Sequence, residues 1–396
     1  MDVFKLNSNN ITNSLWGIGT DFKYKKVTND EIVKKGYLSN ELVYSVTSSL
    51  AKSCATLPIT LMNGDNPAND TDPIYKFFYD DWNKKMGKIE SLEALYLNLF
   101  LHGKAYIWET SEFASLIPTE QWVLPSQQVT TRDNNNSYFD ETPYYYFMDN
   151  GVTVKIPKDE MIVFKYYNPD ILSTEEGLSP LQSVWNTVEA SNNRAIAEGA
   201  MLKNRGISGF ISPKATSGNA GAIGFSNGVI ELVRKAFSGL TGGAEKFNKV
   251  EVIEQAADFT QLGLDANDLK IIEMQLPQLR SICRALNVPS MLFGDYESNT
   301  FANYKEARKS MYTEAIIPQS KMFINQYEKK LLNKINNLTG QRYWLKIAIE
   351  EIEALNKTPL DLFKELPNNI SAALLTDLTP EERKQLILTL GLNGKG

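Results

Sequence analysis

The residue types that most often carry catalysis are sparse in this chain of 396 residues. His102 is the single histidine, so a Ser-His-Asp or Cys-His site would have to use it, and its neighbours Leu101 and Gly103 belong to no recognisable catalytic motif. The two cysteines, Cys54 and Cys283, stand in apolar patterns of helical spacing. We therefore expect a structural or surface histidine and two buried thiols, not a nucleophile, a disulfide or a metal pair.

Sites for nucleotides and for divalent metal ions also lack a complete motif. No Gly-x-x-x-x-Gly-Lys-Ser/Thr loop occurs, and Gly218, Gly221 and Gly224 do not fit the dinucleotide-binding pattern. The pairs Asp80-Asp81 and Glu350-Glu351 offer oxygen ligands for Mg²⁺, but no third ligand motif accompanies them. We expect no enzyme activity, no cofactor and no metal site.

Composition and charge narrow the class of protein. The formal net charge of −6 argues against a protein that holds nucleic acid by covering its phosphates with lysine and arginine. The opening MDVFKLNSNN lacks the apolar stretch of a signal peptide, and no long uncharged apolar run follows, so we expect no membrane segment. Residues 1–38 are rich in Asn, Thr, Ser and Lys with little periodicity, which predicts an extended arm ordered by its neighbours.

Apolar spacing and capping residues predict the first elements after this arm. Asn40 can cap a helix in which apolar residues recur every three or four positions as far as Cys54. Pro58 ends that helix and begins a strand at 58–62. A second helix is expected at 89–101.

The stretch 105–167 consists of short β-rich runs separated by Pro, Gly and Asn. Asn150-Gly151 favours a type I′ turn, which predicts a hairpin between 144–148 and 152–156. The aromatic run 144–147 lacks the interleaved lysine and arginine of a base-stacking platform, so half-buried sheet residues explain it better. The middle of the chain is therefore expected to be α+β.

A Gly-rich and Ser-rich module at 206–260 follows a helix that Ser179 can cap. Strand-like residues at 209–211 and 250–253 flank a short helix predicted at 229–237. This pattern indicates a small module inserted between two helices.

Three elements are predicted in the last third of the chain. Apolar residues from 269 to 286 follow helical spacing, although Pro277 must kink or divide that helix. A longer helix runs over 303–332 with Pro318 as the expected bend, and a strand follows at 343–349.

Segments between about residues 40 and 335, taken in order, resemble the portal protein family of tailed bacteriophages. Lys104 stands where the family more often has Asn. The similar segments are LVYSV at 42–46 with LPI at 57–59, LHGKAY at 101–106, YNP at 167–169 with GLSPL at 177–181, LNVPSMLFG at 286–294, and NYKEA at 303–307.

The resemblance implies an α+β portal fold with wing, stem helices, clip, long bent helix and a small C-terminal helical crown. It divides the chain into an N-terminal arm at 1–38, the wing at 39–180, stem helix 1 at 181–205, the clip at 206–260, stem helix 2 at 261–287, a channel loop with the long helix and a returning wing strand at 288–359, and the crown at 360–396.

The resemblance also implies two groups of functional residues. Asp295 and Glu297 would keep the channel weakly repulsive to DNA, while neutral loop residues would form transient hydrogen bonds to phosphates; an ordinary surface loop is the alternative. The DNA-channel loop comprises Asp295, Tyr296, Glu297, Ser298, Asn299 and Thr300. The clip residues expected to bind partners are Lys214, Phe225, Arg234, Lys235, Lys246 and Lys249.

The expected assembly is a homo-oligomeric ring, a dodecamer, at the capsid vertex of a virion assembled in the host cytoplasm. Its expected partners are the terminase large subunit, a head-tail adaptor, the major capsid protein and double-stranded DNA passing through the channel. Twelve copies at −6 carry −72, which would repel DNA and let it slide. A structural capsid or neck ring without DNA translocation is the alternative function. A nuclease or ATPase of the packaging apparatus is a second alternative, which the missing phosphate loop and ligand cluster disfavour.

Overall fold

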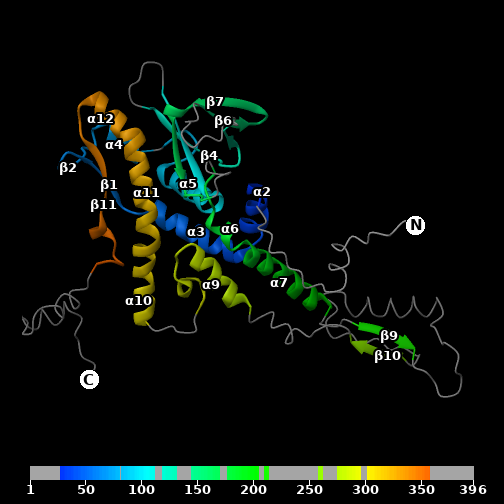
Figure 1. The fold of residues 1–396 in the computed structure, drawn as a ribbon. Helices are drawn as coiled ribbons and strands as arrows, with labels where there is room; N and C mark the ends of the chain where they lie inside the picture. The colour runs from blue at the N-terminus through cyan, green and yellow to red at the C-terminus, as the bar shows by residue number, and fades with distance from the viewer. Residues whose placement is uncertain are drawn as a thin grey trace, which may run out of the picture.

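The computed structural model describes residues 27–80, 82–111, 118–131, 144–169, 176–204, 209–213, 257–261, 274–295 and 301–356. In these residues helices pack together in the middle and several small antiparallel sheets lie at their edges, as Figure 1 shows. The α+β class predicted from the alternating patterns is confirmed. None of the helices in the described ranges is long and apolar enough to cross a membrane.

The predicted extended arm at 1–38 is wrong for residues 29–37, which form helical structure; residues 1–26 lie outside the described residues. Thr28 caps α2 (Asn29–Glu31) through a reciprocal capping box, and η1 (Ile32–Tyr37), a π-helical turn, follows directly. Ile32 is buried, and Gly36 lies beneath the indole of Trp185. These contacts come from a segment far along the chain, so local periodicity did not reveal them.

The next elements follow the sequence closely. Helix α3 (Glu41–Ala55) is capped by Asn40, as predicted, and β1 (Ile59–Asn63) follows it. Helix α4 (Pro73–Tyr79) was not predicted, although Asp72 caps it and Pro73 suits its first turn. Helix α5 (Lys88–His102) confirms the prediction at 89–101 and ends at Gly103, whose φ of 71° is left-handed.

Four small antiparallel sheets organise the strands. The returning strand predicted at 343–349 is β11, and it pairs with β1 across most of the chain length. The sheets are β11 (Tyr343–Ile347), β1 and β2 (Asn66–Pro67); β4 (Glu120–Leu124), β3 (Lys104–Thr110) and β8 (Met161–Lys165); β5 (Val129–Thr130), β6 (Tyr144–Asp149) and β7 (Val152–Pro157); and β10 (Ala257–Gln261) with β9 (Gly209–Pro213).

The hairpin predicted around Asn150-Gly151 is confirmed. Both residues have positive φ, 49° and 84°, as a type I′ turn requires. Three of the four aromatic residues at 144–147 are half-buried, and Lys155 stacks over Tyr144 with its Nζ 3.6 Å from the ring centroid. The aromatic run therefore belongs to the sheet, as expected.

The helix predicted from residue 181 is divided. Ser179 caps α6 (Pro180–Ser183), the chain leaves helical geometry at Val184, and α7 (Trp185–Asn204) continues. In Figure 1 this second helix extends away from the sheets towards β9 and β10. The paired strands β9 and β10 bracket the Gly-rich module, whose predicted elements at 229–237 and 250–253 lie outside the described residues.

Helix α9 and the middle of the long helix lie against α3. Helix α9 (Gln275–Ala285) has Pro277 in its first turn, where a missing N–H costs no intrahelical hydrogen bond. The long helix is confirmed and extends further than predicted, from residue 301 to 339, with a π-helical turn immediately before Pro318. Its segments are α10 (Phe301–Ser310), η6 (Met311–Ile316), α11 (Ile317–Tyr327), η7 (Glu328–Leu332) and α12 (Asn333–Thr339).

One apolar core joins α3, α5, the long helix and β1. Aromatic rings stack in its centre, where Phe323 lies 5.6 Å from Phe164 and 5.2 Å from Tyr327 between ring centroids. Cys54 and Cys283 are buried and free, which confirms that they act as small apolar residues. Short 3₁₀ turns η2 (Lys158–Glu160), η5 (Ser290–Phe293) and η8 (Ile349–Glu351) complete the described elements.

Candidate functional site

An ion pair between a half-buried arginine and a buried carboxylate fixes the start of the loop that leaves η5. The guanidinium of Arg280 in α9 donates two hydrogen bonds to the carboxylate of Asp295, at 2.6 and 2.7 Å, and the Ser290 hydroxyl adds a third at 2.8 Å. Asp295 is 8% exposed. We call Arg280, Ser290 and Asp295 the loop anchor, because together they hold the last described residue before position 301 against α9.

The backbone between α9 and the loop anchor turns sharply at two left-handed residues. Asn287 has a φ of 56°, and the Val288 N–H bonds to the carbonyl of Cys283, which closes the end of α9. Gly294 has a φ of 102° and directs the next residue, Asp295, back towards Arg280. Burial, with a smaller contribution from the negative charge of Asp295, raises the pKa of Cys283 to about 12, so this thiol is no nucleophile.

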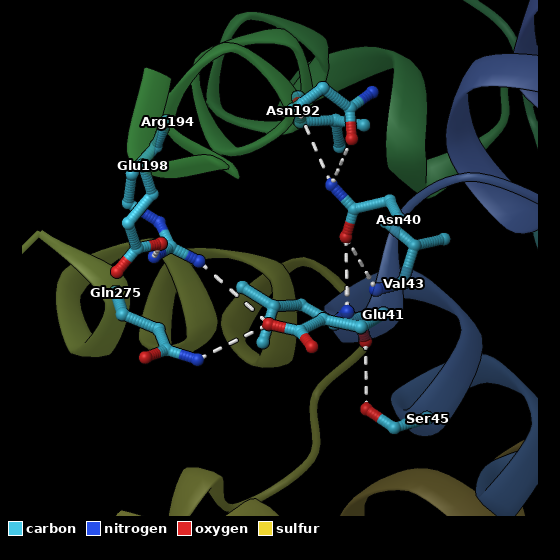
Figure 2. A network of polar contacts seen from close by, with 10 residues as sticks. Asn40, Glu41, Val43, Ser45, Asn192, Arg194, Glu198 and Gln275 are labelled. Carbon is cyan, nitrogen blue, oxygen red and sulfur yellow. Dashed lines mark hydrogen bonds and ion pairs between the residues drawn. The ribbon is translucent and has the colours of Figure 1, made fainter. Parts of the chain in front are cut away.

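A second polar cluster lies where α3 begins, and Figure 2 shows it from close by. Asn40 and Glu41 at the start of α3 contact Asn192 and Arg194 of α7, and Glu41 also accepts from Gln275, the first residue of α9. We call these five residues the α3 junction. It joins α3 to two helices that each lie more than one hundred residues later in the chain.

A third close contact joins the end of α5 to the residues before α6. A methyl group on Gly177 would lie 1.8 Å from the carbonyl oxygen of Gly103, and one on Gly103 would meet the backbone of residues 177–179. Neither position can therefore hold a side chain unless the backbone shifts. Beside it, the Ser179 hydroxyl caps α6 and donates to the carbonyl of Phe100. We call Gly103 and Gly177 the glycine crossing.

Two buried titratable groups, His102 and Glu109, have shifted pKa values. Burial, assisted by Lys104, lowers the pKa of His102 to about 4, so its ring is neutral at pH 7, and its Nε2 lies 3.4 Å from the side-chain amide of Gln127. Burial raises the pKa of Glu109 to about 7, with Glu160 raising it further and Lys334 and Lys330 lowering it. His102 was expected to be a structural or a surface residue, and the structure places it in the interior.

No group of three potential metal ligands occurs among the residues that the structure describes. Within the pair Glu350-Glu351, Glu350 pairs with Lys346 at 3.2 Å instead. Exposed ion pairs of this kind contribute little to stability. The loop anchor, the α3 junction and the glycine crossing are contacts that position segments of the chain relative to one another.

Comparison with known proteins identifies the family. A model of the phage portal protein family matches residues 41–377. The chain belongs to that family. A protein of Rickettsia bellii, described as uncharacterized, is 22% identical over 357 residues, which cover 88% of each chain.

Solved structures share the portal fold of this chain. The neck of an empty gene transfer agent (GTA) particle, computed with C6 symmetry, has a TM-score of 0.64 at 20% identity over 93% of this chain and 94% of that chain. The neck of the native GTA particle, computed with C12 symmetry, has a TM-score of 0.61 at 21% identity, covering 89% and 94%. An HK97-family phage portal protein from Corynebacterium diphtheriae has a TM-score of 0.55 at 13% identity, covering 83% and 99%.

The role predicted for Asp295 in the channel loop is corrected by the structure. Asp295 is not a free loop charge, because it is buried and paired with Arg280. Arg280 and Ser290 were missed, since they are fifteen and five residues from Asp295 and no sequence pattern links the three.

The other predicted site residues lie outside the described residues. For the loop these are Tyr296, Glu297, Ser298, Asn299 and Thr300. For the clip they are Lys214, Phe225, Arg234, Lys235, Lys246 and Lys249.

Proposed function

We propose that this portal protein forms a ring at the capsid vertex through which double-stranded DNA enters and leaves. The family match over residues 41–377 carries this proposal. The GTA neck structures computed with C6 and C12 symmetry support a closed ring, of which a dodecamer is the proposed form. A protein of this kind works by position and charge, not by covalent catalysis.

The predicted regions can be assigned to the described elements on this plan. The wing contains α3, α5 and the sheets built on β1, β3 and β6. The stem helices are α7 and α9, and β9 and β10 lead into and out of the clip. The crown at 360–396 stays a prediction.

The channel loop is reassigned to residues 296–300. Its flanks are held, because Asp295 is tied to Arg280 and residue 301 begins the long helix. A short loop with fixed ends can project into a channel without a large loss of conformational entropy. Glu297 then supplies the negative charge that weakens contact with DNA, and the polar residues beside it supply neutral hydrogen bonds.

The proposed partners act at other surfaces of the ring. The clip at 206–260 would bind the terminase large subunit during packaging and a head-tail adaptor afterwards, because an inserted module is exposed and adaptable. The wing would contact the major capsid protein. Deleting residues 214–248 should abolish binding to terminase and adaptor while the far-ultraviolet circular dichroism of the wing helices is retained; unchanged binding would contradict the clip assignment.

A charge reversal in the loop tests the channel. In intact rings, Glu297→Arg should slow DNA packaging, and more strongly at low salt, because exposed charges are screened beyond about 10 Å at 0.1 M salt. Glu353→Arg reverses an exposed charge outside the loop and should package at the wild-type rate. Wild-type packaging by Glu297→Arg at every salt concentration would remove the loop from the channel.

Electron microscopy of the purified protein tests the ring itself. Class averages should show a closed ring with an opening wide enough for duplex DNA. A closed ring with a narrower opening would favour the other candidate, a neck ring without DNA translocation. Metal-dependent or ATP-dependent cleavage of DNA by the purified chain would overturn the non-enzymatic assignment.

A further inference from the structure

Asn40 uses both ends of its side-chain amide. Its Oδ1 accepts hydrogen bonds from the backbone N–H groups of Leu42 and Val43, each at 3.0 Å, which caps α3. Its Nδ2 donates to Oδ1 of Asn192 at 2.9 Å and to the carbonyl of Val188 at 3.4 Å, both on α7. Asn40 is 3% exposed, so these hydrogen bonds form away from bulk water.

The contact continues beyond Asn40. Asn192 donates from its own Nδ2 to the carbonyl of Lys35 at 2.7 Å, so α7 is also tied to η1. Arg194 is buried and divides its guanidinium between Glu198 on its own helix, at 2.7 Å, and Glu41 on α3, at 3.7 Å. As Figure 2 shows, Asn40 faces α7, and Glu41 faces both α7 and α9.

The position of this contact along α7 matters. Trp185 and Val188, at the start of the helix, are buried in the apolar core. After Arg194 no buried residue occurs in the part of α7 whose side chains the structure describes, and Ile196 is 70% exposed. In Figure 1 the helix continues outwards from there. The Asn40 contact therefore lies where α7 leaves the body of the protein.

We propose that Asn40 is a positioning residue that sets the pivot of α7, so that this helix can swing relative to α3 after the Asn40–Asn192 contact breaks. Asparagine suits this position because Nδ2 donates while Oδ1 accepts. A serine can cap α3 but is too short to reach α7, and an aspartate has no donor. Naming the helix a stem helix rests on the proposed function, whereas the pivot rests on the contacts alone.

Hydrogen–deuterium exchange of the full-length protein can separate capping from coupling. Asn40→Ser should retain the cap and lose the link, so amides of residues 185–199 should exchange roughly fivefold faster, the effect of losing about one net hydrogen bond. Peptides from 41–55 should exchange as in the wild type. Asn40→Ala loses both functions and should accelerate both segments.

Two further variants test whether the change in exchange comes from the Asn40–Asn192 hydrogen bond. Asn192→Ala breaks the same link from α7 without touching the cap, but it also removes the hydrogen bond to the Lys35 carbonyl. The double variant with Asn40→Ser should therefore exchange about as fast as Asn192→Ala alone. Asn193→Ser changes an exposed neighbour and should exchange like the wild type. Wild-type exchange of 185–199 in Asn40→Ser, or equal acceleration of 41–55, would show that Asn40 is a helix cap and nothing more.

This measurement is independent of DNA translocation. A loss of coupling would be seen in the purified chain whether or not it forms a ring, and ring formation is read separately by electron microscopy. Failure of the pivot proposal and failure of the portal function therefore give different results.

Discussion

Gly177 lies so close to Gly103 that a methyl group on its α-carbon would approach the Gly103 carbonyl oxygen to 1.8 Å. That same oxygen accepts the Tyr166 N–H at 2.8 Å, immediately after β8. The end of α5, the end of β8 and the residues leading to α6 thus meet at one carbonyl group. Backbone atoms form both sides of the contact, so rotation of a side chain cannot relieve it.

Gly177→Ala should therefore destabilise the protein severely, by about 3 kcal/mol or more, because backbone must shift to admit the methyl group. The measurement is chemical or thermal unfolding of the purified chain. Gly199→Ala is the matched control: no atom lies within 4 Å of its added methyl group, and it should leave stability unchanged or raise it by up to about 1 kcal/mol, since alanine favours helix. Equal stability of the two variants would show that the crossing relaxes easily.

Removing the charge of Asp295 should loosen the loop anchor. Asp295→Asn replaces two charge-assisted hydrogen bonds from Arg280 by weaker contacts, and we expect a loss of about 1–3 kcal/mol in the free energy of unfolding. Asp30→Asn breaks the exposed pair with Lys34 and should have no measurable effect. If both variants unfold alike, the ion pair at Asp295 does not hold the loop.

His102 should make the fold less stable in acid. Its pKa is lowered from 6.5 to about 4 in the folded protein, so the unfolded chain binds a proton first as the pH falls below 6.5. The stability lost between pH 6.5 and pH 4 amounts to about 3 kcal/mol and is not regained below pH 4. His102→Gln should flatten this part of the stability profile; an unchanged slope would mean that other groups cause the acid sensitivity.

Glu109 should make the fold less stable as the pH rises, the opposite of the effect of His102. Its pKa is raised from 4.5 to about 7, so the folded protein keeps the proton longer than the unfolded chain does. Stability is then lost as the pH rises from 4.5 through 7, again by about 3 kcal/mol. Glu109→Gln is neutral at every pH and should unfold at a higher denaturant concentration than the wild type at pH 8, but not at pH 4. A wild-type midpoint at pH 8 would contradict this.

The sequence by itself determined the elements whose causes are local. Asn40 caps α3, Asn150-Gly151 turns the hairpin and Ser179 starts α6, each as predicted, because a cap or a tight turn depends on a few neighbouring residues. The portal resemblance was also present in the order of short segments, and the family match confirms it. Apolar periodicity gave the long helix but not its ends, since terminal turns depend on what packs against them.

Tertiary structure alone decided what these residues do together. No sequence pattern near Asn40 indicates that its amide nitrogen donates to Asn192, 152 residues later. No pattern near Asp295 indicates that its carboxylate pairs with Arg280. Polarity predicted Asp295 to be a free loop charge, but a buried carboxylate is stable when a guanidinium meets it in the right geometry. Such pairings form when distant helices pack, so their partners are set by the fold and not by spacing along the chain.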